Sequence, residues 1–355
     1  MTIARLARPE IRALQPYEAA QQVDDTIRLN ANEAPWSSTA ESFRRPLNRY
    51  PEIRPQGLGE SLAQYFACDV QQLLVTRGSS EAIDLLIRAF CREGQDNIVT
   101  TSPTFSMYGH YATVQGALQR AVITAEVDGF AFDIDALLDA CDERTRLMFV
   151  CSPNNPTGAV LPRPALIELL ERRGDRSAIV IDEAYIEFSD ESSAVELLHR
   201  YDNLVVLRTL SKALAFAGAR CGAVMGPVDV VCMLNAIQAP YAMSTPVVEC
   251  VEDALEDYCL DEARQGVSVI RDERERLIAE LRENDVVETI WPSAANFFLI
   301  RVADTEALLR QCSDEHVLLR DFDGSLAGCI RITVGTRAEN DRLLQCFRKL
   351  SGDAV

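Results

Sequence analysis

Between about residues 70 and 235, short runs of apolar, β-forming residues alternate with stretches of helical periodicity. Most runs are apolar almost throughout, as a strand must be when helices cover both faces of its sheet. This alternation is typical of an α/β fold with a mostly parallel sheet. The apolar runs lie at 72–76, 97–101, 146–153, 177–185, 203–210 and 220–226, and helical stretches lie at 81–90 and 106–114.

A second unit follows this alternating region. Residues 247–284 have a helical pattern with a charged second half, which predicts one long connector helix. Residues 296–350 predict a strand-helix-strand-strand-helix series in a smaller α+β domain. A chain of 355 residues exceeds the usual size of a single core. We therefore expect an N-terminal arm (1–45) that joins the small domain, a large domain (46–245), and a connector helix with a small C-terminal domain (246–355).

Composition excludes several classes of protein. The formal net charge of −19 disfavours nucleic acid and anionic membranes as partners. Eleven scattered cysteines without a C-x-x-C pair, and three isolated histidines, predict neither a disulfide framework nor a metal site. No signal peptide or membrane-spanning run is recognisable, so we expect a cytoplasmic enzyme.

Ligands of such folds bind beyond the carboxyl ends of the strands, so the residues there are the candidates for a site. Gly78, Ser79 and Ser80 follow the first run and precede a helix, where free N–H groups and hydroxyls could bind an anion. An ordinary serine N-cap would explain the same residues. Asn155 lies in the turn "CSPNNPTG", which could present its amide to a ligand or be only a rigid turn.

Asp182 comes directly after four apolar residues of its strand. A carboxylate there is costly to bury unless a cation accompanies it, although it could also be a hydrated acid at the strand end. Tyr185 lies three residues further on.

Lys212 is one of only two lysines among 35 basic residues. A partly desolvated lysine can lose its proton and attack a carbonyl carbon, which arginine cannot do. A solvated surface lysine is the alternative. Arg220, shortly after it, offers a planar cation for a phosphate. With the acid, the phenol, the amide and the anion site, this set matches what pyridoxal 5′-phosphate (PLP) requires.

The chain resembles the fold type I, aspartate aminotransferase-like PLP enzymes, and in particular their histidinol-phosphate branch, over nearly its full length. The resemblance is carried by ordered motifs, namely "LNANE", "LNRYPE", "TRGSSE", "SPNNPTG", "DEAYIEF", "RTLSKALAFAGARCG", "STPV", "LLRD" and "CIRITVGTR". It implies an α/β large domain with a mostly parallel seven-stranded sheet between helices, plus the smaller α+β domain.

The resemblance also implies roles for individual residues. Lys212 would bond the cofactor aldehyde, Asp182 would pair with the ring nitrogen, and Asn155 and Tyr185 would bond the ring oxygen. The cofactor phosphate would be held by Ser79, Ser80, Ser211 and Arg220. Phe105 would stack on the ring. Tyr50 would reach the cofactor phosphate of a neighbouring subunit, which implies a homodimer.

On the substrate side, the resemblance implies that Arg320 and Arg331 hold the phosphate of histidinol phosphate. Tyr17, Asn32 and Asn296 would line the same side, while Arg337 fits a surface ion pair. The implied reaction transfers an amino group reversibly between glutamate and imidazole-acetol phosphate. Two rivals stay open, a threonine-phosphate decarboxylase on the same scaffold and a PLP-binding sensor module, and the absence of a basic DNA-binding segment counts against the second.

Overall fold

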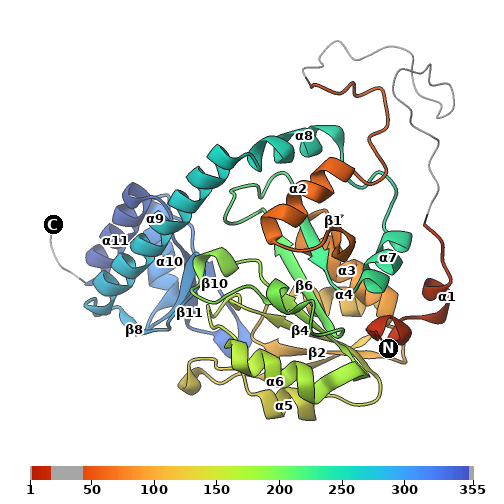
Figure 1. Ribbon diagram of the computed structural model, residues 1–355. Coiled ribbons are helices and arrows are strands. Elements are labelled where there is room, and N and C mark those ends of the chain that lie inside the picture. Colours follow the sequence, from red (N-terminus) through yellow and green to blue (C-terminus); the bar gives the residue numbers. More distant parts are fainter. Residues whose placement is uncertain (1, 17–42, 352–355) are drawn as a thin grey trace.

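The structure is a computed structural model that describes residues 2–16 and 43–351 (Figure 1). Its large part is built on a seven-stranded sheet with the order β1-β7-β6-β5-β4-β2-β3. The strands are β1 (Leu73–Thr76), β2 (Asn97–Ser102), β3 (Leu118–Ile123), β4 (Thr145–Cys151), β5 (Ala178–Asp182), β6 (Leu204–Thr209) and β7 (Gly222–Met225). The predicted mostly parallel α/β sheet is therefore confirmed.

Only β7 runs against its neighbours, since it pairs antiparallel with both β1 and β6 while the other pairs are parallel. The carboxyl ends of the parallel strands and the beginning of β7 therefore lie at one edge of the sheet. This arrangement brings the segment before β7, which contains Arg220, to the same edge as the segments after β1, β4, β5 and β6.

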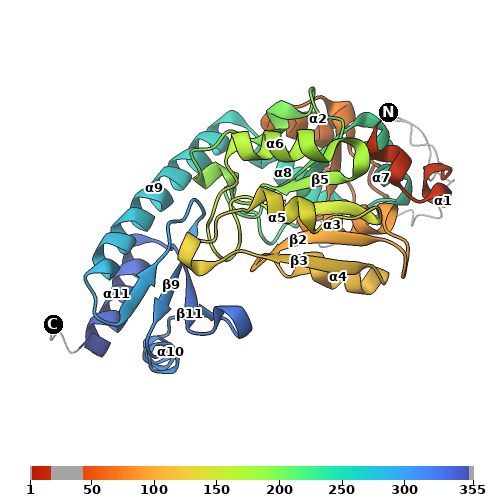
Figure 2. The same cartoon turned by 90° about the horizontal axis from the view of Figure 1, so that it is seen from below.

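Helices cover both faces of this sheet, as Figures 1 and 2 show. One face packs against α2 (Gln56–Phe66), α5 (Ile134–Asp139), α6 (Arg163–Arg173) and α8 (Thr245–Ala254), and the other against α3 (Gly78–Phe90), α4 (Met107–Gln115) and α7 (Val228–Ile237). The central strands β4, β5 and β6 are almost fully buried, which explains their continuous apolar sequence.

The small part is a four-stranded antiparallel sheet with the order β10-β11-β9-β8. Its elements are α9 (Asp257–Arg282), β8 (Val287–Ile290), β9 (Phe297–Val302), α10 (Thr305–Asp314), β10 (Arg320–Asp321), β11 (Cys329–Thr333) and α11 (Arg337–Ser351). Helix α9 runs from the large sheet to this one, and α10 and α11 pack with it around a separate apolar core (Figure 2).

Three sequence expectations differ from the structure. The single helix expected over 247–284 is two helices, because Glu256 adopts an extended conformation between α8 and α9. Strand β3 was not predicted, since it is an edge strand with exposed and charged positions instead of an apolar run. Strand β8 was also not predicted, and its alternation of half-buried and exposed residues over only Val287–Ile290 gives a weak signal.

The short helices near the N-terminus, η1 (Ile3–Leu6) and α1 (Pro9–Arg12), pack on the large part. Ile3 and Ala7 are buried in the apolar cluster that contains α3 and α7. The described part of the arm, residues 2–16, therefore lies against the helices of the large sheet and not, as had been expected from the sequence, against the small part. The reason is that its apolar side chains are buried among those helices. Among the described residues, no helix is both long and apolar enough to span a membrane.

The remaining 3₁₀ helices are short. They are η2 (Val70–Gln72), η3 (Glu126–Asp128), η4 (Gly174–Arg176), η5 (Ile186–Phe188), η6 (Ala194–Leu197) and η7 (Gly324–Leu326).

Candidate active site

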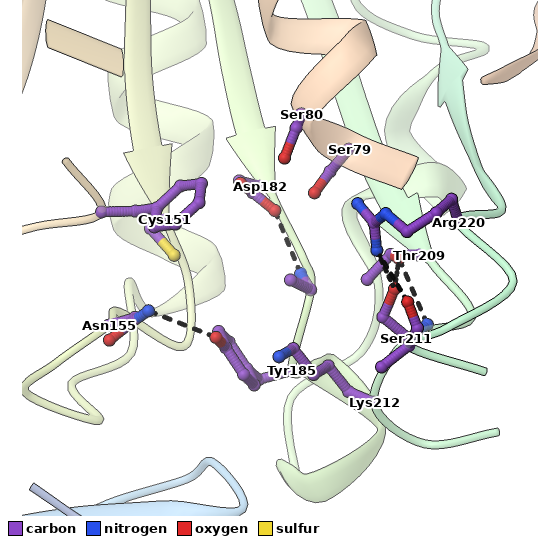
Figure 3. A pocket seen from close by; sticks show the side chains of 13 residues that line it. Ser79, Ser80, Cys151, Asn155, Asp182, Tyr185, Thr209, Ser211, Lys212 and Arg220 are labelled. Carbon is purple, nitrogen blue, oxygen red and sulfur yellow. Dashed lines mark hydrogen bonds between the residues drawn. The ribbon is translucent and has the colours of Figure 1, made fainter. Parts of the chain in front are cut away.

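A cavity of about 200 Å³ lies at the edge of the large sheet where these strand ends meet. Residues predicted from five separate segments of the sequence line it together (Figure 3). They are Ser79, Ser80, Phe105, Asn155, Asp182, Tyr185, Ser211, Lys212 and Arg220, with Cys151, Ala184, Thr209 and Ala217 completing the wall.

One wall is an anion cup at the start of α3. The helix begins at Gly78 and its N-cap is Arg77, which makes no side-chain capping bond, so Ser79 and Ser80 belong to the first turn. The alternative that these serines are ordinary N-caps is therefore wrong. Their hydroxyls and the first-turn N–H groups are available to a ligand at the positive end of the helix.

Arg220 closes this cup from the other side. Its backbone has a positive φ of 54°, and its Nη1 donates to Ser211 Oγ (3.3 Å) and to the carbonyl of Ala217 (3.0 Å). The guanidinium lies so close to Gly78 that a Cβ there would be 2.8 Å from Nη2. Gly78 is thus required by the arginine as well as by its own positive φ of 74°.

Asp182, at the end of β5, is 2% exposed. Its Oδ2 accepts from the hydroxyl of Tyr108 (2.8 Å), and its Oδ1 accepts from the Ala184 N–H (3.2 Å). Burial raises the pKa of this carboxyl to about 6, although Tyr108, Ala184 and the charge of Lys212 oppose the shift. The alternative of a hydrated acid at the strand end is therefore wrong.

Lys212 projects into the cavity from the segment after β6, with its Nζ 5.6 Å from the centre of the Tyr185 ring. Burial lowers the pKa of this amine, and the positive charges of Arg331 and Arg220 lower it further. Asp182 acts in the opposite direction. The amine is therefore closer to losing its proton near neutral pH than a solvated lysine is.

A chain of hydrogen bonds crosses the cavity from the small sheet. Arg331 of β11 donates from Nη1 to Asn155 Oδ1 (2.6 Å), and Asn155 Nδ2 lies 3.3 Å from the Tyr185 hydroxyl. Figure 3 shows the second of these contacts. Asn155 thus lines the cavity with an amide that is hydrogen-bonded at both ends.

The remaining predicted residues have different surroundings. Arg320 is exposed and pairs with Arg331 across β10 and β11, and Asn296 has a buried Oδ1 without a hydrogen-bond partner among the described residues. Tyr50 is half exposed and stacks on Tyr241 with ring centres 4.7 Å apart. Tyr17 and Asn32 lie outside the described residues. Arg337 bonds Glu273 (3.2 Å), as expected for an ion pair.

Sequence reasoning missed Tyr108, Cys151 and Thr209. Tyr108 lies on α4 behind the cavity, and its hydroxyl donates to the cavity-lining Asp182. Thr209 Oγ1 donates to Ser211 Oγ (2.9 Å) and so supports the cup. Cys151 and Thr209 are the last residues of β4 and β6, so their strand-end position was the available signal.

Comparisons with known proteins agree with this site. Residues 16–347 match the family model of the class I and II aminotransferases. Curated proteins named histidinol-phosphate aminotransferase, from Cronobacter sakazakii and Escherichia coli K12, are each 40% identical to this chain. The alignments span 100% and 98% of this chain and 99% and 98% of theirs.

Two solved structures show the same fold. The histidinol-phosphate aminotransferase of Clostridium acetobutylicum has a TM-score of 0.78 at 23% identity, covering 87% of this chain and 92% of its own. That of Sinorhizobium meliloti, solved in complex with PLP, has a TM-score of 0.77 at 24% identity, covering 86% and 84%.

Fold, pocket and family match define a fold type I PLP-dependent aminotransferase. The chain belongs to the histidinol-phosphate aminotransferases within the class I and II family.

Proposed function

We propose that this chain binds PLP through Lys212 and catalyses a step of histidine biosynthesis. It transfers an amino group reversibly from glutamate to imidazole-acetol phosphate, giving L-histidinol phosphate and 2-oxoglutarate. One observation carries the proposal: a lysine with a lowered pKa, a fully buried carboxylate and an anion cup face a single cavity. The 40% identity to curated enzymes of this activity supports it.

The residues present fit this cofactor. A buried carboxylate is costly unless a cationic group meets it, and a protonated pyridine nitrogen would be that group for Asp182. The Arg220 guanidinium lies so close to Gly78 that a side chain there would displace it, and this places the cation beside the start of α3, where a phosphate would bind. Ser79, Ser80, Ser211 and Arg220 would hold that phosphate, Asn155 and Tyr185 the ring oxygen, and Phe105 one ring face.

When bound, PLP supplies an aldehyde that takes up an amine and a ring that accepts the electron pair left by a departing proton. The protein's own residues do the rest. Asp182 would keep the ring nitrogen protonated. Once the amine of the substrate has displaced Lys212 from the aldehyde carbon, Lys212 Nζ would take the α-proton of the substrate and return it to a different carbon. A lysine of lowered pKa suits this role because a general base works best with a pKa near the working pH.

The substrate phosphate is assigned to Arg320 and Arg331. They lie directly opposite each other on β10 and β11, where two like charges repel. Neither arginine forms an ion pair with an acid of the described chain, and Arg331 Nε is buried without a partner among the same residues. An anion between the two guanidinium groups would relieve their repulsion and supply the missing acceptor.

The functional unit is proposed to be a homodimer in which Tyr50 serves the neighbouring site. Its ring stacks on Tyr241 and is not among the side chains that line the cavity of its own chain. Mixing Lys212→Ala with Tyr50→Leu tests this assignment, because each variant alone lacks one required group. If Tyr50 acts across the interface, the mixed dimer regains one complete site and activity returns; if it acts within its own chain, mixing restores nothing.

Product analysis tests the proposed reaction. The purified enzyme loaded with PLP is incubated with imidazole-acetol phosphate and glutamate, and in parallel with threonine phosphate. We expect 2-oxoglutarate and histidinol phosphate from the first mixture and no CO2 from the second. Release of CO2 from threonine phosphate without 2-oxoglutarate from glutamate would establish the decarboxylase instead, and PLP binding without turnover of either substrate would establish the sensor.

A further inference from the structure

We propose that Tyr108 is a positioning residue that keeps Asp182 ionised and aimed at the cofactor ring nitrogen. The inference rests on the proposed function, since it concerns how this chain tunes the group that faces PLP. Tyr108 does not line the cavity, and its hydroxyl donates a hydrogen bond to Asp182, which does.

The geometry leaves the phenol little freedom. Tyr108 is fully buried, and its ring stacks on Phe149 of β4 with centres 4.9 Å apart and planes 15° apart. Its other side meets the edge of Phe105, 5.7 Å away. Packing on both sides fixes the hydroxyl at 2.8 Å from Asp182 Oδ2.

Phe105 lies just before α4 and Tyr108 lies in its first turn, and the two side chains have different surroundings. Phe105 faces the cavity, where a stacked ring is expected, while Tyr108 lies behind Asp182. Phe105 would contact the face of the bound cofactor ring, and Tyr108 holds Asp182, which would face the ring nitrogen. The contact between Phe105 and Tyr108 therefore connects these two parts of the site.

Asp182 depends on few donors. Among the described residues, its carboxylate accepts only from the Tyr108 hydroxyl and the Ala184 N–H, and no arginine pairs with it. A hydrogen bond to the charged form of an acid favours ionisation, and the Tyr108 bond opposes the effect of burial on the Asp182 pKa. Burial raises the pKa of the phenol itself, so Tyr108 remains a donor.

The consequence concerns a proton shared between Asp182 and the ring nitrogen. With Tyr108 donating, the carboxylate is a weak base and the proton stays on nitrogen. Without it, Asp182 becomes more basic and draws the proton toward its own oxygen. A bound ring with less positive charge accepts electrons less readily, and it is also held less tightly by the carboxylate.

The alternative is a purely structural role, in which Tyr108 fills the core and its buried hydroxyl bonds whichever acceptor is nearby. Tyr108→Phe separates the two ideas, because it keeps the ring and removes one oxygen. The matched control is Tyr201→Phe, whose hydroxyl bonds Glu171 (3.0 Å) far from the cavity.

The test uses each holoenzyme loaded with PLP that carries ¹⁵N in its ring, and measures the nitrogen chemical shift by NMR together with the PLP dissociation constant. In the wild type and in Tyr201→Phe, we expect the ring nitrogen to carry most, but not all, of the proton that it shares with Asp182. In Tyr108→Phe, the shift should move toward the unprotonated value and the dissociation constant should rise about tenfold. Wild-type values for both quantities in Tyr108→Phe would overturn the proposal.

Replacing Tyr108 with 3-fluorotyrosine covers the case in which the phenylalanine variant does not fold. Fluorine keeps the shape and makes the phenol a stronger donor, so the nitrogen signal should move further toward the protonated value. No movement, or movement the other way, contradicts the proposal. Failure of the proposed function would look different, because the wild type itself would then bind no PLP or show an unprotonated ring nitrogen.

Discussion

In the absence of a ligand, the buried carboxyl of Asp182 lowers the stability of the folded protein. Its carboxyl is buried and its pKa is raised from 3.8 to about 6. An unfolded chain ionises this group more easily than the folded apoenzyme does, so the folded state loses stability as the pH rises from about 4 through about 6. The charge that Asp182 would present to the cofactor in the proposed function therefore lowers the stability of the protein without cofactor.

Asp182→Asn should therefore remove a pH-dependent loss of apoenzyme stability. Relative to this variant, we expect the free energy of unfolding of the wild type to fall by up to about 3 kcal/mol between pH 4 and pH 7.5. Urea unfolding of both apoenzymes across this range measures the difference. Parallel stability profiles would show that Asp182 does not titrate as the structure indicates.

The sequence predicted most residues of the cavity because they follow strands, where backbone topology alone brings them together. Lys212, Asp182 and Asn155 are of this kind. Tyr108 could not be predicted in this way, because it lies on α4 and not after a strand. Its contact with Asp182 depends on the direction in which its side chain points. Arg320 and Arg331 were named from the family resemblance, but their placement directly opposite each other is a matter of strand register and needed the structure.

At the scale of elements, a buried ion cluster joins the segment after β5 to β6. Arg208 of β6 lies 2.6 Å from Glu187 and 3.6 Å from Glu183, and it also covers the ring of Phe66. The two glutamates flank Tyr185 in sequence, and Arg208 lies on β6, shortly before the segment that carries Lys212. The cluster therefore fixes the two segments that carry the acid, the phenol and the lysine relative to one another.

Arg208→Met should destabilise the protein strongly. It leaves two buried carboxylates without their cation, which costs about 3–5 kcal/mol when one partner of a buried pair is removed. The control is Arg200→Met, whose exposed pair with Glu171 contributes about 1 kcal/mol or less. Urea unfolding measures both variants, and equal effects would contradict the role given to the cluster.

Element boundaries were predictable where burial was uniform. The apolar runs identified β1, β2, β4, β5, β6 and β7 because each is covered on both sides. The edge strand β3 and the short strand β8 were not predicted, because at least half of the residues in each face solvent. The division between α8 and α9 has no glycine or proline to mark it, so periodicity alone continued the helix.

At the scale of the whole molecule, the site depends on contacts between the two sheets. Arg331 of the small sheet bonds Asn155 of the large part, and Arg274 of α9 donates to the carbonyls of Ala295 (2.9 Å) and Phe188 (3.4 Å). The Ala294 N–H donates to the carbonyl of Gly158, in the same turn as Asn155. These contacts hold β11, which carries one of the two arginines proposed for the substrate phosphate, against the turn that lines the proposed cofactor cavity.

Arg320→Gln tests whether the small sheet binds the substrate while the large sheet binds the cofactor. The residue is exposed and belongs to the small sheet, so its loss should raise the KM for histidinol phosphate about tenfold while PLP affinity stays unchanged. Arg310→Gln, an exposed arginine of α10 paired with Glu306, is the control and should change neither quantity. Steady-state kinetics and PLP titration provide the readouts, and an unchanged KM in Arg320→Gln would remove this residue from the phosphate site.

The most direct test of the central claim uses the scarcity of lysine. The chain has two lysines, Lys212 in the cavity and Lys349 on α11, where its amine bonds Glu315. Borohydride reduction of the holoenzyme, followed by mass spectrometry of its peptides, locates the residue that is covalently bound to PLP. The account predicts a stable adduct on Lys212 and none on Lys349; an adduct on Lys349 alone, or an unmodified Lys212 in a fully loaded enzyme, would contradict it.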